Sequence, residues 1–175
     1  PMTDNQTIKD SILQKALADI PFDGWTEDVL ARAAVTSGYT SDMVQAVFPR
    51  GVRDALVHFS ALADRQMLQA LKQTDPSMLK VPARVALAVK TRFEMLEPHR
   101  EAERLAIAWW LRPFRKIEGA KIVWNTADAI WLWAGDTATD YNHYTKRTLL
   151  SGVITSTAFF WLNDQSEGRK DSWAF

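Results

Sequence analysis

Apolar side chains recur along this chain at helical spacing, and the strict alternation of apolar and polar positions that marks a β-strand is nearly absent. The first apolar stripe spans residues 8–20, and we expect its helix to end at Pro21. Thr26 is a good N-cap for a second helix, which Gly38 terminates. Further helices are expected over residues 41–48, 52–71, 85–96, 101–111, 114–134 and 142–162, before a polar tail over 163–171.

The expected fold class is all-α, with a single domain over residues 1–175. Within it we distinguish a helix-turn-helix-like subregion over 1–50 and a larger helical part over 51–175. Of the 175 residues 47% are apolar and 24% charged, which is typical of a folded chain. The chain has no cysteine, which excludes disulfides, thiolate zinc sites and a cysteine nucleophile. The longest uncharged stretch, 148–163, is shorter than the roughly 20 residues of a membrane-spanning helix.

The first three helices have the spacing of a helix-turn-helix module of the TetR kind, with Gly38 at the turn. DNA binding requires a basic surface, because phosphate neutralisation supplies most of the affinity. Residues 1–60 instead hold five basic and eight acidic side chains, a net charge of −3. The candidate recognition helix, 41–48, carries Asp42 and no base, and only Gln45 could read a base edge. We therefore expect a scaffold without nucleic-acid binding, and keep a TetR-type ligand-responsive regulator as the alternative.

The sequence indicates no catalytic residues and no metal site. It has three histidines, and one of them, His143, follows Asp140 at a spacing that shares a helix face. A carboxylate-bridged di-iron site needs two such elements and further carboxylates, and there is no second copy. Ser151 and Gly152 lie in an apolar stretch without a nearby base, so they indicate close helix packing or dimerisation instead of nucleophilic catalysis.

Tryptophan is the unusual feature of the composition. The chain has eight, seven of them between residues 109 and 173. Trp109 and Trp110 are adjacent, so on a helix they point about 100° apart and cannot both fill one narrow core stripe. A helix that is apolar all round is either central or faces something apolar. The excess indicates a dimer interface, a cavity for a lipid or apolar ligand, a membrane-contacting patch, or a crowded tryptophan-rich core.

One segment resembles the coenzyme Q nine family of ubiquinone-biosynthesis accessory proteins, whose bacterial members are similar. The resemblance rests on Ala134-Gly135-Asp136, on Thr139-Asp140-Tyr141-Asn142-His143-Tyr144-Thr145-Lys146-Arg147, and on Ser172-Trp173. Weaker similarity runs from Ile8 to Trp173. It implies a TetR-like fold, a homodimer formed through late helices, and a bound lipid in place of DNA binding.

The resemblance also implies a non-enzymatic protein that presents isoprenoid quinone intermediates to the demethoxyubiquinone hydroxylase. It needs no cofactor besides a bound isoprenoid lipid or phospholipid, and it is cytoplasmic, with peripheral contact to the inner membrane. The partner-facing residues it implies are Ile130, Asp140, His143, Tyr144 and Arg147. From their helical faces we assign the lipid site to Val89, Phe93, Trp109, Trp110, Trp124, Trp131, Ile154 and Phe160.

Two departures from the family pattern bear on these expectations. The family motif usually has Trp where this chain has His143, which removes an aromatic anchor of the kind that dominates interfaces. Family members continue past Trp173 into an amphipathic membrane-binding helix, whereas this sequence stops at Phe175.

Overall fold

The structure is a computed structural model, and it describes residues 2–136 and 141–174. All the regular secondary-structure elements of these residues are helices. The expected all-α fold is confirmed for these residues. Short 3-10 turns, η1 to η3, supplement the α-helices. The elements are α1 (Met2–Asp23), α2 (Glu27–Thr36), α3 (Met43–Val47), α4 (Val52–Leu71), η1 (Pro76–Met78), α5 (Val81–Leu96), η2 (Glu97–His99), α6 (Arg100–Trp110), α7 (Lys116–Trp133), α8 (Tyr141–Asn163) and η3 (Glu167–Trp173).

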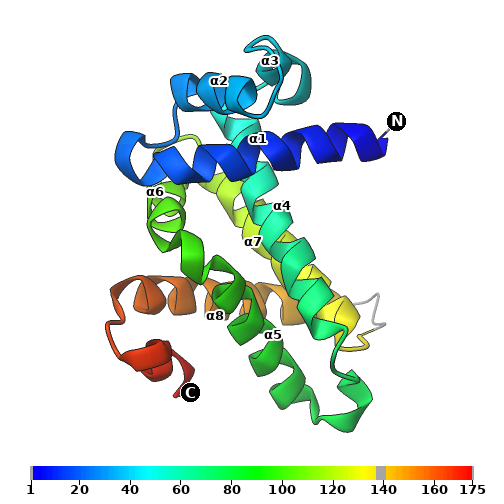
Figure 1. The fold of residues 1–175 in the computed structure, drawn as a ribbon. Helices are drawn as coiled ribbons and strands as arrows, with labels where there is room; N and C mark the ends of the chain where they lie inside the picture. Colours follow the sequence, from blue (N-terminus) through cyan, green and yellow to red (C-terminus); the bar gives the residue numbers. More distant parts are fainter. Residues whose placement is uncertain (1, 137–140, 175) are drawn as a thin grey trace. The chain divides into compact units, whose positions relative to one another are not determined.

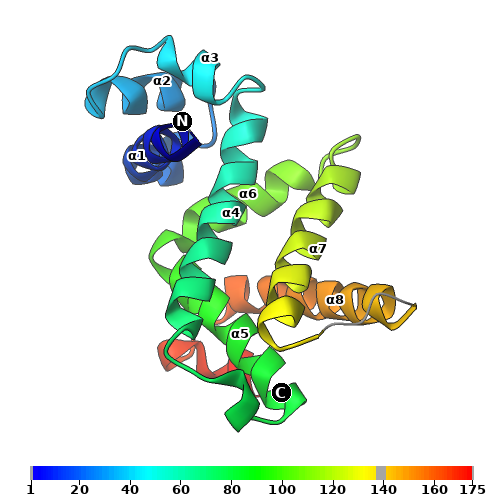
Figure 2. The same ribbon diagram turned by 90° about the vertical axis from the view of Figure 1, so that its right-hand side faces the viewer.

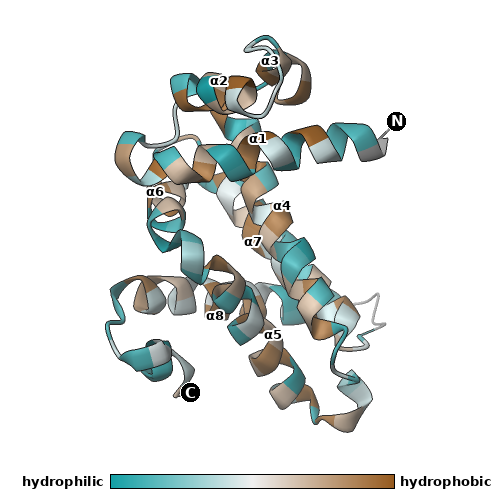
Figure 3. Cartoon of the chain, viewed as in Figure 1, coloured by the Kyte–Doolittle hydropathy of each residue, from teal (hydrophilic) through white to brown (hydrophobic). Residues whose placement is uncertain are grey.

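The chain forms two compact units. Unit 1 comprises residues 1–62 and 99–110, and unit 2 comprises 63–98 and 111–175. Helix α4 belongs to unit 1 as far as Leu62 and to unit 2 from Ala63. The expected subregion boundary at residue 50 does not coincide with a limit of either unit. Figure 3 shows apolar residues recurring along the helices of both units, as the sequence pattern predicts.

In unit 1, α2 and α3 lie together against α1 (Figure 1), and α6 also packs on α1. Trp25 is buried, donates its indole N–H to the Ala102 carbonyl at 3.1 Å, and packs on Phe59 with ring centroids 5.2 Å apart. The Glu27 carboxylate accepts the Val52 N–H at 3.0 Å and so satisfies a donor at the start of α4. These contacts tie α2 and α6 to α4 through side chains far apart in sequence.

In unit 2, α7 and α8 pack against each other and cross at a large angle (Figure 2). Helix α5 also packs on α7. A polar tie links three helices: Asp64 on α4 accepts from Arg92 on α5 at 2.7 Å and from Thr126 on α7 at 2.8 Å. Arg92 and Thr126 are buried, so the tie satisfies groups that would otherwise be costly inside a core.

Two of the helix ends that differ from expectation lie at prolines. Helix α1 continues through Pro21 to Asp23 and stops at Gly24, whose φ of +79° suits glycine. Helix α5 begins at Val81, with Pro82 in its first turn, where a missing N–H costs nothing. The residues after Asn163 also depart from the expected polar tail, since they form η3.

Candidate functional site

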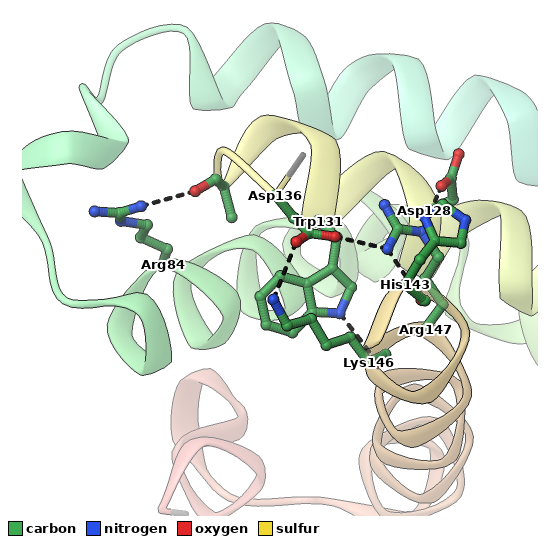
Figure 4. Close-up of polar contacts among 8 residues, drawn as sticks. Arg84, Asp128, Trp131, Asp136, His143, Lys146 and Arg147 are labelled. Carbon is green, nitrogen blue, oxygen red and sulfur yellow. Dashed lines mark hydrogen bonds and ion pairs between the residues drawn. The ribbon is translucent and has the colours of Figure 1, made fainter. Parts of the chain in front are cut away.

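A polar network of unit 2 joins the C-terminal part of α7 to the first turns of α8, and we call this region the α7–α8 corner (Figure 4). At its centre, Arg147 on α8 is fully buried. Its Nε donates to Asp128 Oδ1 at 2.6 Å, and its Nη1 donates to Asp136 Oδ2 at 2.8 Å and to the His143 carbonyl at 3.1 Å. One guanidinium thereby joins Asp128 within α7, Asp136 three residues beyond the end of α7, and the first turns of α8.

Lys146 and Trp131 form a second layer on the same corner. The Lys146 ammonium donates to Asp136 Oδ1 at 3.0 Å and lies 5.3 Å from the centre of the Trp131 ring. Trp131 in turn donates its indole N–H to the Lys146 carbonyl at 3.1 Å. Asp136 is therefore held by two cations, one on each carboxylate oxygen, as the dashed lines of Figure 4 show.

Arg84 on α5 fixes the end of α7. Its Nη1 donates to the Ala134 carbonyl at 2.7 Å and its Nε to the Leu79 carbonyl at 2.8 Å. Gly135 follows with a φ of +93°, the left-handed conformation that closes a helix. The Ala-Gly-Asp motif is thus a helix end whose last carbonyl and following carboxylate both bind arginine.

The electrostatics of the corner favour a permanently charged Arg147. Burial by itself would lower the pKa of Arg147, but its hydrogen bonds to Asp128 and Asp136 outweigh burial and raise that pKa above its ordinary value. The arginine therefore stays charged at every physiological pH and can hold its two carboxylate partners throughout that range.

The structure places the predicted partner-facing residues in two environments. Ile130 and Arg147 are fully buried and stabilise the corner from within. Tyr144 is 62% exposed, and its ring lies 5.1 Å from that of the half-buried His143. His143 also lies 6.0 Å from the Trp124 ring, in the position where the family pattern has tryptophan. The fifth residue, Asp140, lies outside the described residues.

The eight predicted lipid-site residues are also divided. Val89, Phe93 and Ile154 are buried in unit 2, Trp124 and Trp131 are half-buried there, and Phe160 is exposed on α8. Trp109 and Trp110 belong to unit 1, where their rings meet edge to face at 4.8 Å and the Arg53 guanidinium lies 5.1 Å from the Trp109 ring. Six of the eight predicted lipid-site residues therefore lie in one compact unit, unit 2. Whether any of the eight binds lipid stays a prediction.

Sequence reasoning missed a second polar network, which secures the residues after α8. Asp164 accepts from the backbone N–H and hydroxyl of Ser166, at 2.8 and 2.6 Å, and from those of Ser172, at 2.9 and 2.6 Å. Glu97 accepts from the Trp161 indole at 2.9 Å and from Arg169 at 2.8 Å. The sequence did contain a signal for part of this network. Asp164 and Ser166 have the spacing of an Asx turn, in which the aspartate side chain accepts from the backbone two residues later.

Burial would raise the pKa of Asp164, but the four hydrogen bonds from Ser166 and Ser172 lower it well below its ordinary value. Asp164 therefore holds the start of η3 as a carboxylate.

Residues 2–136 and 141–174 contain no group of three or more His, Asp or Glu side chains arranged to hold a metal ion. His58 pairs with Asp10 at 2.6 Å, while its sequence neighbour Asp54 binds Arg50. Among those same residues, no helix combines the length and the apolar character that crossing a bilayer requires.

Residues 117–175 match the COQ9 family model. Over 172 residues the chain is 30% identical to the "Ubiquinone biosynthesis protein COQ9, mitochondrial" of Drosophila melanogaster, covering 96% of this chain and 52% of that protein. It is 27% identical to the human protein of the same name, covering 97% and 55%. The chain spans about half the length of the curated relatives it matches. The resemblance to the coenzyme Q nine family is confirmed.

The fold is similar to that of a solved structure, a TetR transcriptional regulator from Nitrosomonas europaea ATCC 19718. The TM-score is 0.76 over 95% of this chain and 92% of that one, at 18% sequence identity. The TetR-like fold predicted from the sequence is therefore confirmed, and the likeness carries no statement about function.

Proposed function

Because residues 117–175 are COQ9-family sequence, we propose that this chain is a non-enzymatic accessory protein of ubiquinone biosynthesis. It binds an isoprenoid quinone intermediate and presents it to the demethoxyubiquinone hydroxylase. The names of the curated relatives support the pathway. The lipid-binding and presenting roles rest on features of unit 2.

The observation that carries the proposal is the apolar surface of α8, a helix that lies wholly within the family match. Leu149 is 67% exposed and Phe160 is 54% exposed, and Val153 between them is also exposed. These three residues are four and seven positions apart, so they share one helix face. Single exposed apolar residues are normal on a protein surface, whereas several on one helix face, here called the apolar row, indicate an apolar partner.

An isoprenoid quinone fits this surface chemically. Each CH₂ group that leaves water contributes roughly 0.8 kcal/mol, so a polyprenyl chain binds even a shallow apolar surface strongly. The Phe159 and Phe160 rings at the end of the row can stack on a quinone headgroup, and the buried Phe93 and Ile154 support the helix from beneath. A bound lipid removes the row of exposed side chains from water.

The α7–α8 corner supplies the presenting role. Arg147 and its two carboxylates fix the start of α8, and this places Tyr144 and His143 together on the surface. Tyrosine is favoured in protein interfaces because its ring gives a large contact area and its hydroxyl still forms hydrogen bonds. Tyr144 is therefore the contact residue for the hydroxylase, and Arg147 is a positioning residue.

Mass spectrometry of organic extracts from natively purified protein tests lipid binding. We expect isoprenoid quinones at near-stoichiometric levels, and we expect Leu149→Ser with Phe160→Ser to lower them several-fold. The matched control is Met78→Ser, since Met78 is an apolar residue of unit 2 outside α8 that is even more exposed than Leu149 and Phe160. Lipid-free protein, or the same lipid content in all variants, would refute lipid binding.

A second copy of the chain is the competing occupant of the α8 surface, since exposed Gly152 and Ser156 would allow another helix to approach closely. Light scattering after gel filtration measures the mass. A dimer that Phe160→Ser converts to monomer, with no lipid in the extracts, assigns the apolar row to dimerisation.

Hydroxylase docking is tested by pull-down with Tyr144→Ala. We expect clearly weaker capture, with Tyr144→Phe retaining most of it because the ring is kept. Unchanged capture by Tyr144→Ala would show that the corner is not the docking surface.

The alternative, a TetR-type regulator, receives support from the fold alone. Among the basic residues of 1–60, Arg32 pairs with Asp23 at 2.8 Å and Arg50 pairs with Asp54 at 2.8 Å. Helix α3 has five residues and none is basic. We expect no DNA binding in a mobility-shift assay at moderate salt, and a salt-dependent shift with the chain's own upstream DNA would favour the regulator.

A further inference from the structure

The connection between α6 and α7 carries the most exposed apolar side chain given for the described residues. Phe114 is 103% exposed, and it is flanked by Ile117 at 77% and Leu111 at 49%. The connection and the first turn of α7 lie at the end of α7 away from α8 (Figure 2). This apolar tip, defined as Leu111, Phe114 and Ile117, is separate from the α8 row and from the α7–α8 corner.

The backbone holds Phe114 outward at a cost. Residues 112–115 form a turn closed by the Arg115 N–H and the Arg112 carbonyl at 3.2 Å, with Pro113 second and Phe114 third. Phe114 has a φ of +69°, in the left-handed region that glycine normally occupies at this place in a Pro-containing turn. A strained, bulky residue where glycine would fit better is often a functional residue.

The charges around the apolar tip are predominantly basic. Residues 111–121 contain Arg112, Arg115, Lys116 and Lys121 against a single acid, Glu118, a net charge of +3. Arg112, Lys116 and Lys121 are exposed. Apolar side chains that project from a ring of bases match the bilayer boundary, where the apolar groups enter the acyl region and the bases meet anionic headgroups.

We propose that residues 111–121 form a membrane-contact site for a bilayer surface that contains anionic lipid. Phe114 enters the interface, Leu111 and Ile117 flank it, and the exposed bases bind phosphate groups. An acidic protein surface would satisfy the bases but would leave an extended phenylalanine without an apolar environment, so the membrane is the better match. The site goes beyond the proposed function, because it places the chain on a bilayer whether or not a lipid occupies α8.

Co-sedimentation with vesicles tests the site. We expect binding to phosphatidylcholine vesicles that contain phosphatidylglycerol, weaker binding at raised salt, and little binding to phosphatidylcholine alone. Lys116→Glu changes two charges and should weaken binding about tenfold or more, at roughly 1 kcal/mol for each charge near the surface. The new acid lies in the first turn of α7, where it suits the helix dipole, so the fold is retained.

Phe114→Gly separates binding from folding. We expect vesicle binding to fall at least several-fold while the thermal midpoint stays the same or rises, because glycine relieves the backbone strain. Phe22→Ala is the control, since Phe22 is 86% exposed but stands beside Asp19 and Asp23. We expect it to bind vesicles like the unmodified chain.

The absence of native cysteine allows a direct measure of insertion. A polarity-sensitive dye on Phe114→Cys should brighten when anionic vesicles are added, and the same dye on Phe22→Cys should not. Failure of the unmodified chain to bind vesicles would overturn the site. So would binding that Phe114→Gly and Lys116→Glu leave unchanged, or capture of an acidic protein by the tip without vesicle binding. Vesicle binding and co-purified quinone are separate measurements, so each proposal can fail without the other.

Discussion

Replacing Arg147 by methionine tests whether the buried ion-pair network holds the α7–α8 corner together. Methionine keeps the length and apolar stem of the side chain but removes all the guanidinium donors. The Arg147 and Asp136 side chains are 1% and 5% exposed, and that of Asp128 is 33% exposed. The variant therefore leaves one carboxylate deeply buried and another partly buried without their arginine.

Removing one partner of a buried pair costs about 3–5 kcal/mol, because the remaining charge is left uncompensated. Two features of this corner place the cost near the lower end. Lys146 still binds Asp136 at 3.0 Å, and Asp128 can turn toward water. We therefore expect Arg147→Met to destabilise the corner by about 3 kcal/mol, or roughly a hundredfold in the local opening equilibrium.

Hydrogen exchange read by mass spectrometry is the suitable assay, because two compact units need not unfold in one step. Amides of α7 and α8 should lose protection by about a hundredfold, while those of α1 and α2 keep theirs. Arg147→Lys should fall in between, since an ammonium cannot reproduce the fork that reaches Asp128 and Asp136.

A double-mutant cycle with Asp136→Asn completes the test. The two changes should be non-additive by about 1 kcal/mol or more, because the second removes the charge that the first leaves uncompensated. A loss below about 1 kcal/mol in Arg147→Met, or simple additivity, would refute the view that the network stabilises this corner.

Four further predictions concern other parts of the molecule. Gly51→Ala should lower the unfolding free energy by about 1–2 kcal/mol in urea titrations, because φ is +63° and an added Cβ would meet the Glu27 carboxylate. Gly152→Ala should instead raise it by about 0.5–1 kcal/mol, because nothing lies near its added Cβ in mid-helix. Trp25→Phe should cost about 0.5–1.5 kcal/mol by calorimetry, because it removes the indole hydrogen bond to the Ala102 carbonyl. Asp164→Asn should lose the most stability, relative to the unmodified chain, above pH 5. The difference should shrink as the pH falls below 3.8, because the pKa of Asp164 is lowered in the folded chain and protonation at low pH removes the stabilisation that its carboxylate provides.

The helices were predictable because their signals are local. The expected 52–71 helix coincides with α4, and 142–162 differs from α8 by one residue at each end. Apolar periodicity and caps act over a few residues, so they can be read from sequence. Two of the errors at helix ends arose at Pro21 and Pro82, where proline lies in a terminal turn and removes at most one hydrogen bond.

The role of Arg147 was harder to predict, because arginine is mostly exposed and its partners here are 11 and 19 residues away. A signal was nevertheless present. Asp128 and Asp136 are the only charged residues in 122–136, and Lys146 and Arg147 are the only Lys or Arg in 141–163. Isolated charges of opposite sign in two neighbouring apolar helices must pair with each other or leave the core.

The net charge of the whole chain is a weak guide to what its surfaces bind, because it averages over distance. The whole chain has 21 basic and 21 acidic side chains, which indicates no attraction to nucleic acid or anionic lipid. Charges separated by more than a Debye length of about 8 Å act independently at physiological salt, so a surface responds to its local charge. Residues 1–60 carry −3, which disfavours DNA at the helix-turn-helix region, and residues 111–121 carry +3 around the exposed Phe114. A neutral chain can therefore repel one polyanion through its first helices and attract an anionic bilayer through a single turn.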